Sequence, residues 1–220
     1  MSRAFLLKLI PSLVLLLFGS AALAQQSAAG HYRIDLQKSD IHWLVYKAGA
    51  LSHLGHNHVI AVGKLTGDVY VAPKLADSRF DMQMPVKDFV VDNPELRAKE
   101  GKDFETQPTP KDIDGTRHNM LGDKVLDAEK YPAIKITGTG PTGAPGSQQL
   151  HLTIDIQGRP IALTVPTKVS FGDDTLKASG EFQLTHEQLG LKPFSIMFGA
   201  LQVADEMHFS YDVTAERVAE

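Results

Sequence analysis

Three histidines, His53, His56 and His58, stand within six residues of one another. If a strand begins at His56, then His56 and His58 lie on one face of it, because side chains two apart in a strand point the same way. A turn at Gly55 would bring His53 beside them. Three neutral imidazoles suit zinc, copper or nickel, and an open fourth position makes such a metal reactive. The cluster therefore gives one hypothesis: a metalloprotein that stores a divalent metal or catalyses a metal-dependent hydrolytic or redox step.

The same histidines also suit a rim turn at which the rings hydrogen-bond to backbone and water without a metal. No glutamate lies among them to act as a base, in contrast to the His-Glu-x-x-His helix motif. The chain has no cysteine, which excludes disulfides, thiolate catalysis and iron–sulfur clusters. It also lacks a glycine-rich phosphate loop and a nucleophile-elbow serine. These features favour a protein that is not an enzyme, with metal binding left open as the alternative.

The beginning of the chain has the composition of an export signal. Two basic residues precede the apolar run at residues 9–18, and Ala22-Leu23-Ala24 matches a small-residue cleavage site. The run is shorter than the ~20 residues that a helix needs to cross a bilayer. We therefore expect a cleavable signal peptide over residues 1–24, one domain over residues 25–220 and a periplasmic location.

Alternation of apolar and polar residues dominates the rest of the chain, as expected for half-buried strands. Ile41, Trp43 and Val45, for example, alternate with polar or outward-facing neighbours. Such runs, separated by glycine and proline turn signals, fall at residues 31–36, 41–47, 60–72, 79–90, 133–139, 149–157, 160–170 and 175–185, with a ninth at 201–214. The pattern predicts a mainly β protein, either a barrel or a sandwich.

Residues 92–131 lack this alternation and are rich in charged residues and turn formers. Pro94 suits the first turn of a short helix, and a second helix is expected from about Lys111 to Leu121. A segment of this length between strands commonly forms a lid or a binding loop. We therefore expect a flap, inserted between strands, that covers one end of the barrel.

Three segments carry a resemblance to a known family. Asp127-Ala128-Glu129-Lys130-Tyr131-Pro132 leads into a strand, residues 152–163 form a strand, a Gly-x-Pro turn and a second strand, and Val203-Ala204-Asp205-Glu206-Met207 opens the last strand. In this order and spacing they resemble the YceI-like family, the exported polyisoprenoid-binding proteins, over about residues 32–215. The resemblance implies an eight-stranded antiparallel, lipocalin-like β-barrel with short helices and a long apolar ligand in its lumen.

An eight-stranded barrel is wide enough either to be filled by side chains or to enclose one small ligand. Each CH₂ moved from water into such a lumen gains ~0.8 kcal/mol, so burial alone could hold an isoprenoid tail. The same inward-facing residues would also suit a core packed without a ligand. The residues expected to line the lumen are Trp43, Val45, Phe80, Met82, Met84, Ile134, Ile136, Ile154 and Phe209.

The expected function is that of a periplasmic carrier for an isoprenoid, such as a quinone-like lipid, with no catalysis. Acidic residues outnumber basic ones, 26 to 22, and an acidic surface does not attract nucleic acid. The apolar run at residues 194–201 could line the portal of the lumen and touch a membrane transiently, or it could be a buried loop or a strand edge. The sequence leaves the oligomeric state open, a dimer included.

Overall fold

The computed structural model describes residues 28–144 and 146–219, and the expected signal peptide over residues 1–24 lies outside them. Within this part of the chain, none of the helices combines the length and the apolar character that a membrane span requires. The strands are β1 (Gly30–Ile34), β2 (Asp40–Ala48), β3 (His58–Val62), β4 (Thr66–Val71), β5 (Arg79–Pro85), β6 (Phe89–Val91), β7 (Ala133–Thr142), β8 (Gln148–Ile156), β9 (Arg159–Phe171), β10 (Thr175–Thr185), β11 (Ser195–Ile196) and β12 (Leu201–Arg217). The α-helices are α2 (Pro94–Arg97) and α3 (Pro110–Leu121), and short 3-10 helices occur at Leu36–Lys38, Ser52–Leu54, Leu75–Asp77, Val86–Asp88, Lys102–Phe104 and Met197–Gly199.

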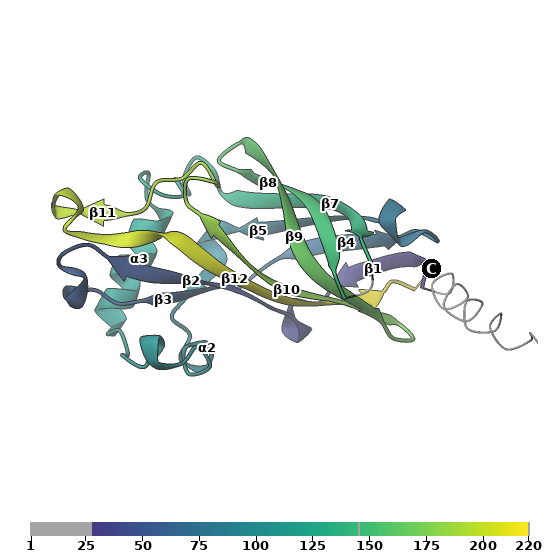
Figure 1. The fold of residues 1–220 in the computed structure, drawn as a ribbon, viewed down its shortest axis with the longest axis horizontal. Coiled ribbons are helices and arrows are strands. Elements are labelled where there is room, and N and C mark those ends of the chain that lie inside the picture. Colours follow the sequence, from purple (N-terminus) through teal and green to yellow (C-terminus); the bar gives the residue numbers. More distant parts are fainter. Residues whose placement is uncertain (1–27, 145, 220) are drawn as a thin grey trace, which may run out of the picture.

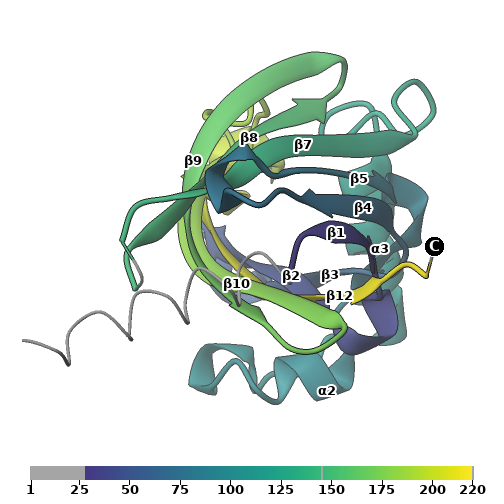
Figure 2. The same cartoon turned by 90° about the vertical axis from the view of Figure 1, so that its right-hand side faces the viewer.

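Eight strands form a closed antiparallel barrel in the order β1-β4-β5-β7-β8-β9-β10-β12. Strand β12 pairs back onto β1, with Tyr32 opposite Arg217 and Ile34 opposite Ala215, and so closes the ring. Figure 2 shows these strands curving around a common axis. The mainly β fold and the eight-stranded antiparallel barrel predicted from the sequence are therefore confirmed.

Strand β12 is long enough to take part in two walls. Its last residues pair with β1, whereas residues 202–212 pair with β2, and β3 and β6 continue the sheet beyond β2. Strand β6 follows β5 after the single 3-10 turn Val86–Asp88. The extra strands prolong the barrel at one end (Figure 1).

The single strands expected at residues 60–72 and 79–90 are each two strands, so these two predictions are wrong in their bounds. The chain leaves β3 for β4 at residues 63–65, where it passes from the extension to the closed barrel. Gly63 suits this crossing because a Cβ there would lie 2.2 Å from the carbonyl oxygen of Asp88. Close approach of two backbones is a use that only glycine serves.

Helix α3 covers the prolonged end of the barrel (Figure 1). Thr109 and Asp112 form a capping box that starts the helix. The Arg117 guanidinium donates a hydrogen bond to the carbonyl oxygen of Phe89 at 2.5 Å and so fastens the helix to β6. The predicted flap with short helices between residues 92 and 131 is therefore confirmed.

Candidate functional site

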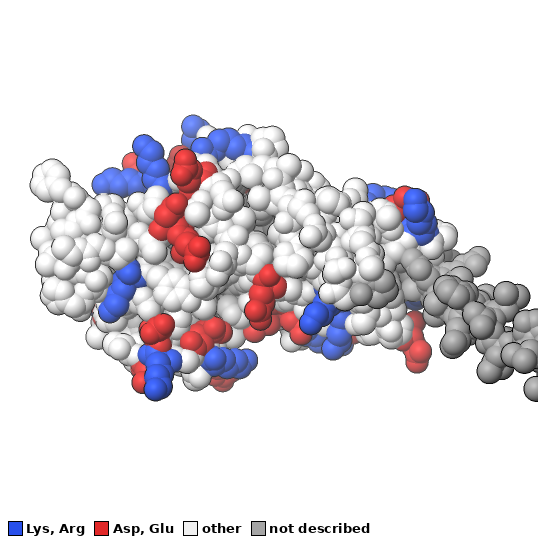
Figure 3. Space-filling model, in the orientation of Figure 1, with Lys and Arg blue, Asp and Glu red and all other residues white. Residues whose placement is uncertain are grey.

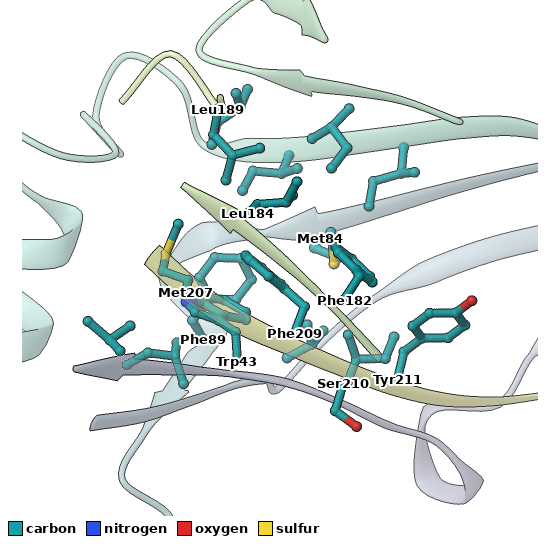
Figure 4. A pocket seen from close by; sticks show the side chains of 18 of the residues that line it. Trp43, Met84, Phe89, Phe182, Leu184, Leu189, Met207, Phe209, Ser210 and Tyr211 are labelled. Carbon is teal, nitrogen blue, oxygen red and sulfur yellow. The ribbon is translucent and has the colours of Figure 1, made fainter. Parts of the chain in front are cut away.

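The barrel contains an apolar cavity with a volume of about 560 Å³ (Figure 4). Alternate residues of each strand face the interior and form its wall. Because the cavity has this volume, side chains from opposite walls leave space for a ligand and do not meet across the middle. All nine residues expected to line a lumen lie in this wall: Trp43, Val45, Phe80, Met82, Met84, Ile134, Ile136, Ile154 and Phe209.

Aromatic rings form a contiguous row along one side of the cavity. The Trp43 ring meets Phe89 edge to face, with centroids 5.1 Å apart, and stacks on Phe209 at 5.9 Å. Phe209 stacks in turn on Phe182 at 5.2 Å, and Phe182 meets Tyr211 edge-on at 6.2 Å. Figure 4 shows the rings grouped at the centre of the site. They give a rigid apolar surface on which a hydrocarbon chain can lie.

The sequence prediction omits several residues of the wall. Strand β10 contributes Ala178, Phe182 and Leu184, and all three line the cavity. They are separated by even numbers of residues, which is the same period-2 signal that identified the other walls. Reading the alternation residue by residue within the predicted strand 175–185 would have found them.

One polar side chain of the wall has a fixed orientation: His58, at the start of β3. Its Nδ1 atom lies 2.6 Å from Oδ2 of Asp92. Its Nε2 atom lies 3.3 Å from Oγ1 of Thr116 on α3. Both His58 and Thr116 line the cavity. The imidazole is therefore held between a carboxylate and the helix that covers the cavity.

Behind His58, Asp92 and Arg97 form a buried ion pair. Their side chains are 0% and 1% exposed, and Nη1 of Arg97 donates to Oδ1 of Asp92 at 2.6 Å. The backbone N–H of Val59 donates to the same oxygen at 2.9 Å. Burial alone would raise the pKa of Asp92, but the hydrogen bond of His58 and the charge of its protonated form, with the hydrogen bonds of Val59 and Arg97, outweigh burial and lower that pKa.

The lowered pKa predicts an acid-sensitive stability. Because Asp92 has a pKa below its ordinary 3.8 in the folded state, its ionisation stabilises the fold fully above that ordinary value. The contribution is lost as the pH falls from about 4 through the folded-state pKa. We expect the free energy of unfolding, measured by urea denaturation from about pH 5 to about pH 3, to fall more steeply in the wild-type protein than in Asp92→Asn. Equal slopes for the two proteins would contradict this assignment.

The structure does not bring the three clustered histidines together as metal ligands. His53 lies in the 3-10 helix Ser52–Leu54 and is exposed, whereas His56 and His58 line the cavity with ring centroids 6.3 Å apart. Both ring nitrogens of His58 already have side-chain partners. Among the described residues, no group of three or more His, Cys, Asp or Glu side chains is arranged to hold a metal ion. The predicted ligand set is not formed, because the 3-10 turn places His53 on the surface.

The apolar run at residues 194–201 reaches the surface. Ile196, Met197 and Phe198 are exposed, and Phe198 is completely so. Ile196 also lines the cavity, together with Leu201. The run lies at the end of the barrel that α3 covers (Figure 1). It therefore connects the cavity with the surface. Of the two alternatives, the buried loop is wrong, whereas the strand edge is partly confirmed, because Ser195–Ile196 form the short strand β11 beside β12.

Comparisons with known proteins agree with this architecture. The family model of the YceI-like domain matches residues 32–215. BcnA of Burkholderia cenocepacia shares the fold, with a TM-score of 0.60 and 18% identity over 82% of this chain and 98% of BcnA. The Campylobacter jejuni YCEI protein shares it with a TM-score of 0.51 and 13% identity over 73% of this chain and 85% of that protein. None of the curated proteins matches. Because the family model covers most of the chain, this protein belongs to the YceI-like family.

Proposed function

We propose that this protein is a periplasmic carrier that holds one long-chain isoprenoid, such as a quinone-like lipid, in its barrel and catalyses no reaction. The observation that carries the proposal is the apolar cavity of about 560 Å³ inside the closed barrel. That volume lies within the usual range of ligand sites. A barrel of eight strands can be filled by its own side chains, whereas this interior has room for a ligand. The chain belongs to the YceI-like family. Its resemblance to that family implies the same class of ligand.

Burial alone is sufficient to hold the tail of such a ligand. Each CH₂ that leaves water gains ~0.8 kcal/mol, and the aromatic row provides a continuous surface along which the tail makes contact. Met82 and Met84 add flexible thioethers to the wall, which adapt to the shape of a branched chain. No charged group is needed to anchor the tail.

The wall contains a reporter for the test. Trp43 is the single tryptophan of the chain and lines the cavity. Titration with a quinone that bears an isoprenoid tail should quench Trp43 fluorescence and saturate at one ligand per chain. The same quinone ring without a tail should give no saturable quenching. Equal responses to the two quinones, or no saturation with the tailed one, would contradict a tail-binding cavity.

We also propose that the ligand enters and leaves during transient contact of an apolar tip with a lipid bilayer. The tip consists of Leu54, Ile196, Met197 and Phe198, of which Leu54 and Met197 are 62% and 60% exposed. Two loops carry these residues, and a backbone hydrogen bond of 2.8 Å from the N–H of residue 51 to the carbonyl oxygen of residue 200 joins them. The tip is therefore one surface feature built from two parts of the chain.

Charge and backbone conformation both favour a bilayer as the partner of the tip. Residues 49–58 and 193–204 contain no Lys, Arg, Asp or Glu, and Figure 3 shows few charged side chains at this end of the molecule. Met197 and Phe198 have φ of +52° and +56°, a conformation that costs a non-glycine residue ~1–2 kcal/mol. In this strained conformation both large apolar side chains are exposed to water. An exposed apolar protrusion of this kind suits insertion at a membrane interface.

The double variant Met197→Asp, Phe198→Asp should slow transfer of a tailed quinone from vesicles to the protein by about tenfold or more, because each apolar side chain that inserts contributes ~1.5–3 kcal/mol. Trp43 quenching measures the rate, with vesicles of phosphatidylethanolamine and phosphatidylglycerol as donors. Val90→Asp is the matched control, since Val90 is another exposed apolar residue, 39% accessible, that does not line the cavity. Equal transfer rates for the double variant and the control would rule out the tip as the membrane contact.

A further inference from the structure

Several polar residues of the cavity wall lie at the end covered by α3, whereas others, such as Ser78 and Arg79, lie at the start of β5. Lys111, Gly115 and Asn119 line the cavity, and so do Asp112 and Thr116. These positions recur every four residues and therefore form one face of the helix. The helix thus presents hydroxyl, amide and charged groups to a cavity whose barrel walls are mainly apolar, and His58 faces it from β3.

The hydrogen-bond network fixes what His58 can offer a ligand. An ionised carboxylate only accepts hydrogen bonds, so the proton in the contact of 2.6 Å between His58 and Asp92 belongs to Nδ1. In the neutral imidazole the other nitrogen, Nε2, is then an acceptor. Among the described residues, the hydrogen-bond partner of Nε2 is the hydroxyl of Thr116, at 3.3 Å, which is long for a hydrogen bond from a hydroxyl. A ligand hydroxyl can therefore replace Thr116 as the donor to Nε2.

The buried Asp92–Arg97 ion pair behind His58 is less favourable for stability than apolar packing would be. A buried ion pair is commonly no more stable than well-packed apolar residues of the same size. Asp92 has φ of +55°, a conformation that non-glycine residues adopt at a cost. Arg97 also donates to the backbone oxygens of Asn57, Phe104 and Thr106 and so fixes the loop before α3. Arg97 and Asp92 thus have a structural role. Of the three side chains His58, Asp92 and Arg97, His58 is the one that lines the cavity.

Space for a headgroup exists beside Thr116. Gly115 lies inside α3 and lines the cavity, and a Cβ added to it would meet no atom within 4 Å. Glycine in the interior of a helix is less stable than alanine by ~1 kcal/mol. Gly115 is also exposed, so the absence of a side chain here leaves open space at the mouth of the cavity, next to Thr116 and at the end where His58 lies.

We propose that His58, oriented by Asp92 and Arg97, is the hydrogen-bond acceptor for the headgroup of the ligand, and that it selects an isoprenoid with a free hydroxyl group. This inference rests on the proposed carrier function and narrows its ligand: a quinone has only acceptor carbonyls, whereas a prenol or a quinol has the donor hydroxyl that Nε2 requires. The tail lies along the aromatic row, and the hydroxyl reaches Nε2 in the space beside Gly115. His58 is thus a specificity-determining residue, whereas Asp92 and Arg97 are positioning residues.

The test compares two probes with one tail: a long-chain prenol and its methyl ether, which has no donor. Quenching of Trp43 by a tailed quinone that each probe displaces gives their affinities for the full-length mature protein. The wild-type protein should bind the alcohol about tenfold more tightly than the ether, as one hydrogen bond in an apolar site provides. His58→Phe should reduce this preference to about one. His56→Phe changes the neighbouring cavity histidine, which is not part of the hydrogen-bond network of Asp92, and should retain the preference.

A second variant keeps His58 intact. Gly115→Leu fills the open space and should lower the affinity for the alcohol by about tenfold, with little effect on the affinity for the ether, because the hydroxyl no longer reaches Nε2. Equal affinities of the wild-type protein for alcohol and ether, or a preference that survives both His58→Phe and Gly115→Leu, would overturn the headgroup site but leave the carrier function standing. Failure of both probes to bind the wild-type protein would overturn the carrier function and this inference with it.

Discussion

Ala178→Phe is expected to weaken binding of a tailed quinone by about 100-fold or more while it raises the free energy of unfolding by about 1 kcal/mol. Ala178 lies in β10 and lines the cavity. A phenyl ring there takes space that the ligand tail needs. Exclusion of about four CH₂ groups removes ~3 kcal/mol of burial, which corresponds to roughly 150-fold in affinity. Filling a cavity commonly stabilises the unliganded protein by ~0.5–2 kcal/mol, so the two effects have opposite signs.

Lys177→Phe is the matched control for this prediction. Lys177 precedes Ala178 in β10, is exposed and does not line the cavity, because adjacent residues of a strand face opposite sides of the sheet. Trp43 quenching measures affinity and urea denaturation measures stability in both variants. If Ala178→Phe bound the quinone as tightly as Lys177→Phe, the ligand would have to lie outside the barrel interior.

Arg97→Met is expected to lower the free energy of unfolding by about 3–5 kcal/mol, because it leaves the carboxylate of Asp92 buried without its counter-charge. Arg33→Met is the control, since Arg33 forms an Arg–Asp pair with Asp68 in which the arginine side chain is 64% exposed. Exposed pairs contribute at most ~1 kcal/mol. Urea denaturation near neutral pH should therefore separate the two variants by several kcal/mol.

A double variant shows whether the cost of Arg97→Met comes from the unpaired charge. Asn in place of Asp92 removes the charge and tolerates the left-handed backbone conformation. The protein with Arg97→Met and Asp92→Asn together should therefore be more stable than Arg97→Met alone. A double variant that is less stable than Arg97→Met would show that lost packing, and not a buried unpaired carboxylate, explains the effect.

Local sequence patterns were sufficient to predict the wall of the cavity. Trp43, Val45 and Met82 were expected inside because strand alternation is a local property of consecutive residues, and the structure places them in the cavity wall. Phe182 lay in a predicted strand and was omitted although the same signal applied. The predicted strands at 60–72 and 79–90 were too long, because the breaks depend on where the chain passes from one wall to the next.

The polar end of the site could not be predicted in the same way. Asp92 follows β6 and Arg97 ends the short helix α2, in a segment of the sequence without periodicity. Their pairing with His58 depends on how this segment folds back against β3. The histidine cluster shows the limit of spacing as a signal. Spacing alone suggested three ligands, whereas His53 lies in an exposed 3-10 turn and His56 and His58 line the cavity. Which side chains meet depends on tertiary contacts that the local sequence does not contain.

The central claim is that the barrel interior holds an apolar lipid in the cell. Native mass spectrometry of the protein, isolated under non-denaturing conditions from the cells that produce it, tests this most directly. We expect a species heavier than the polypeptide by the mass of one isoprenoid, which solvent extraction removes and identifies, and which Ala178→Phe lacks. A protein that always shows the mass of the polypeptide alone, or a bound mass that persists in Ala178→Phe, would contradict the account.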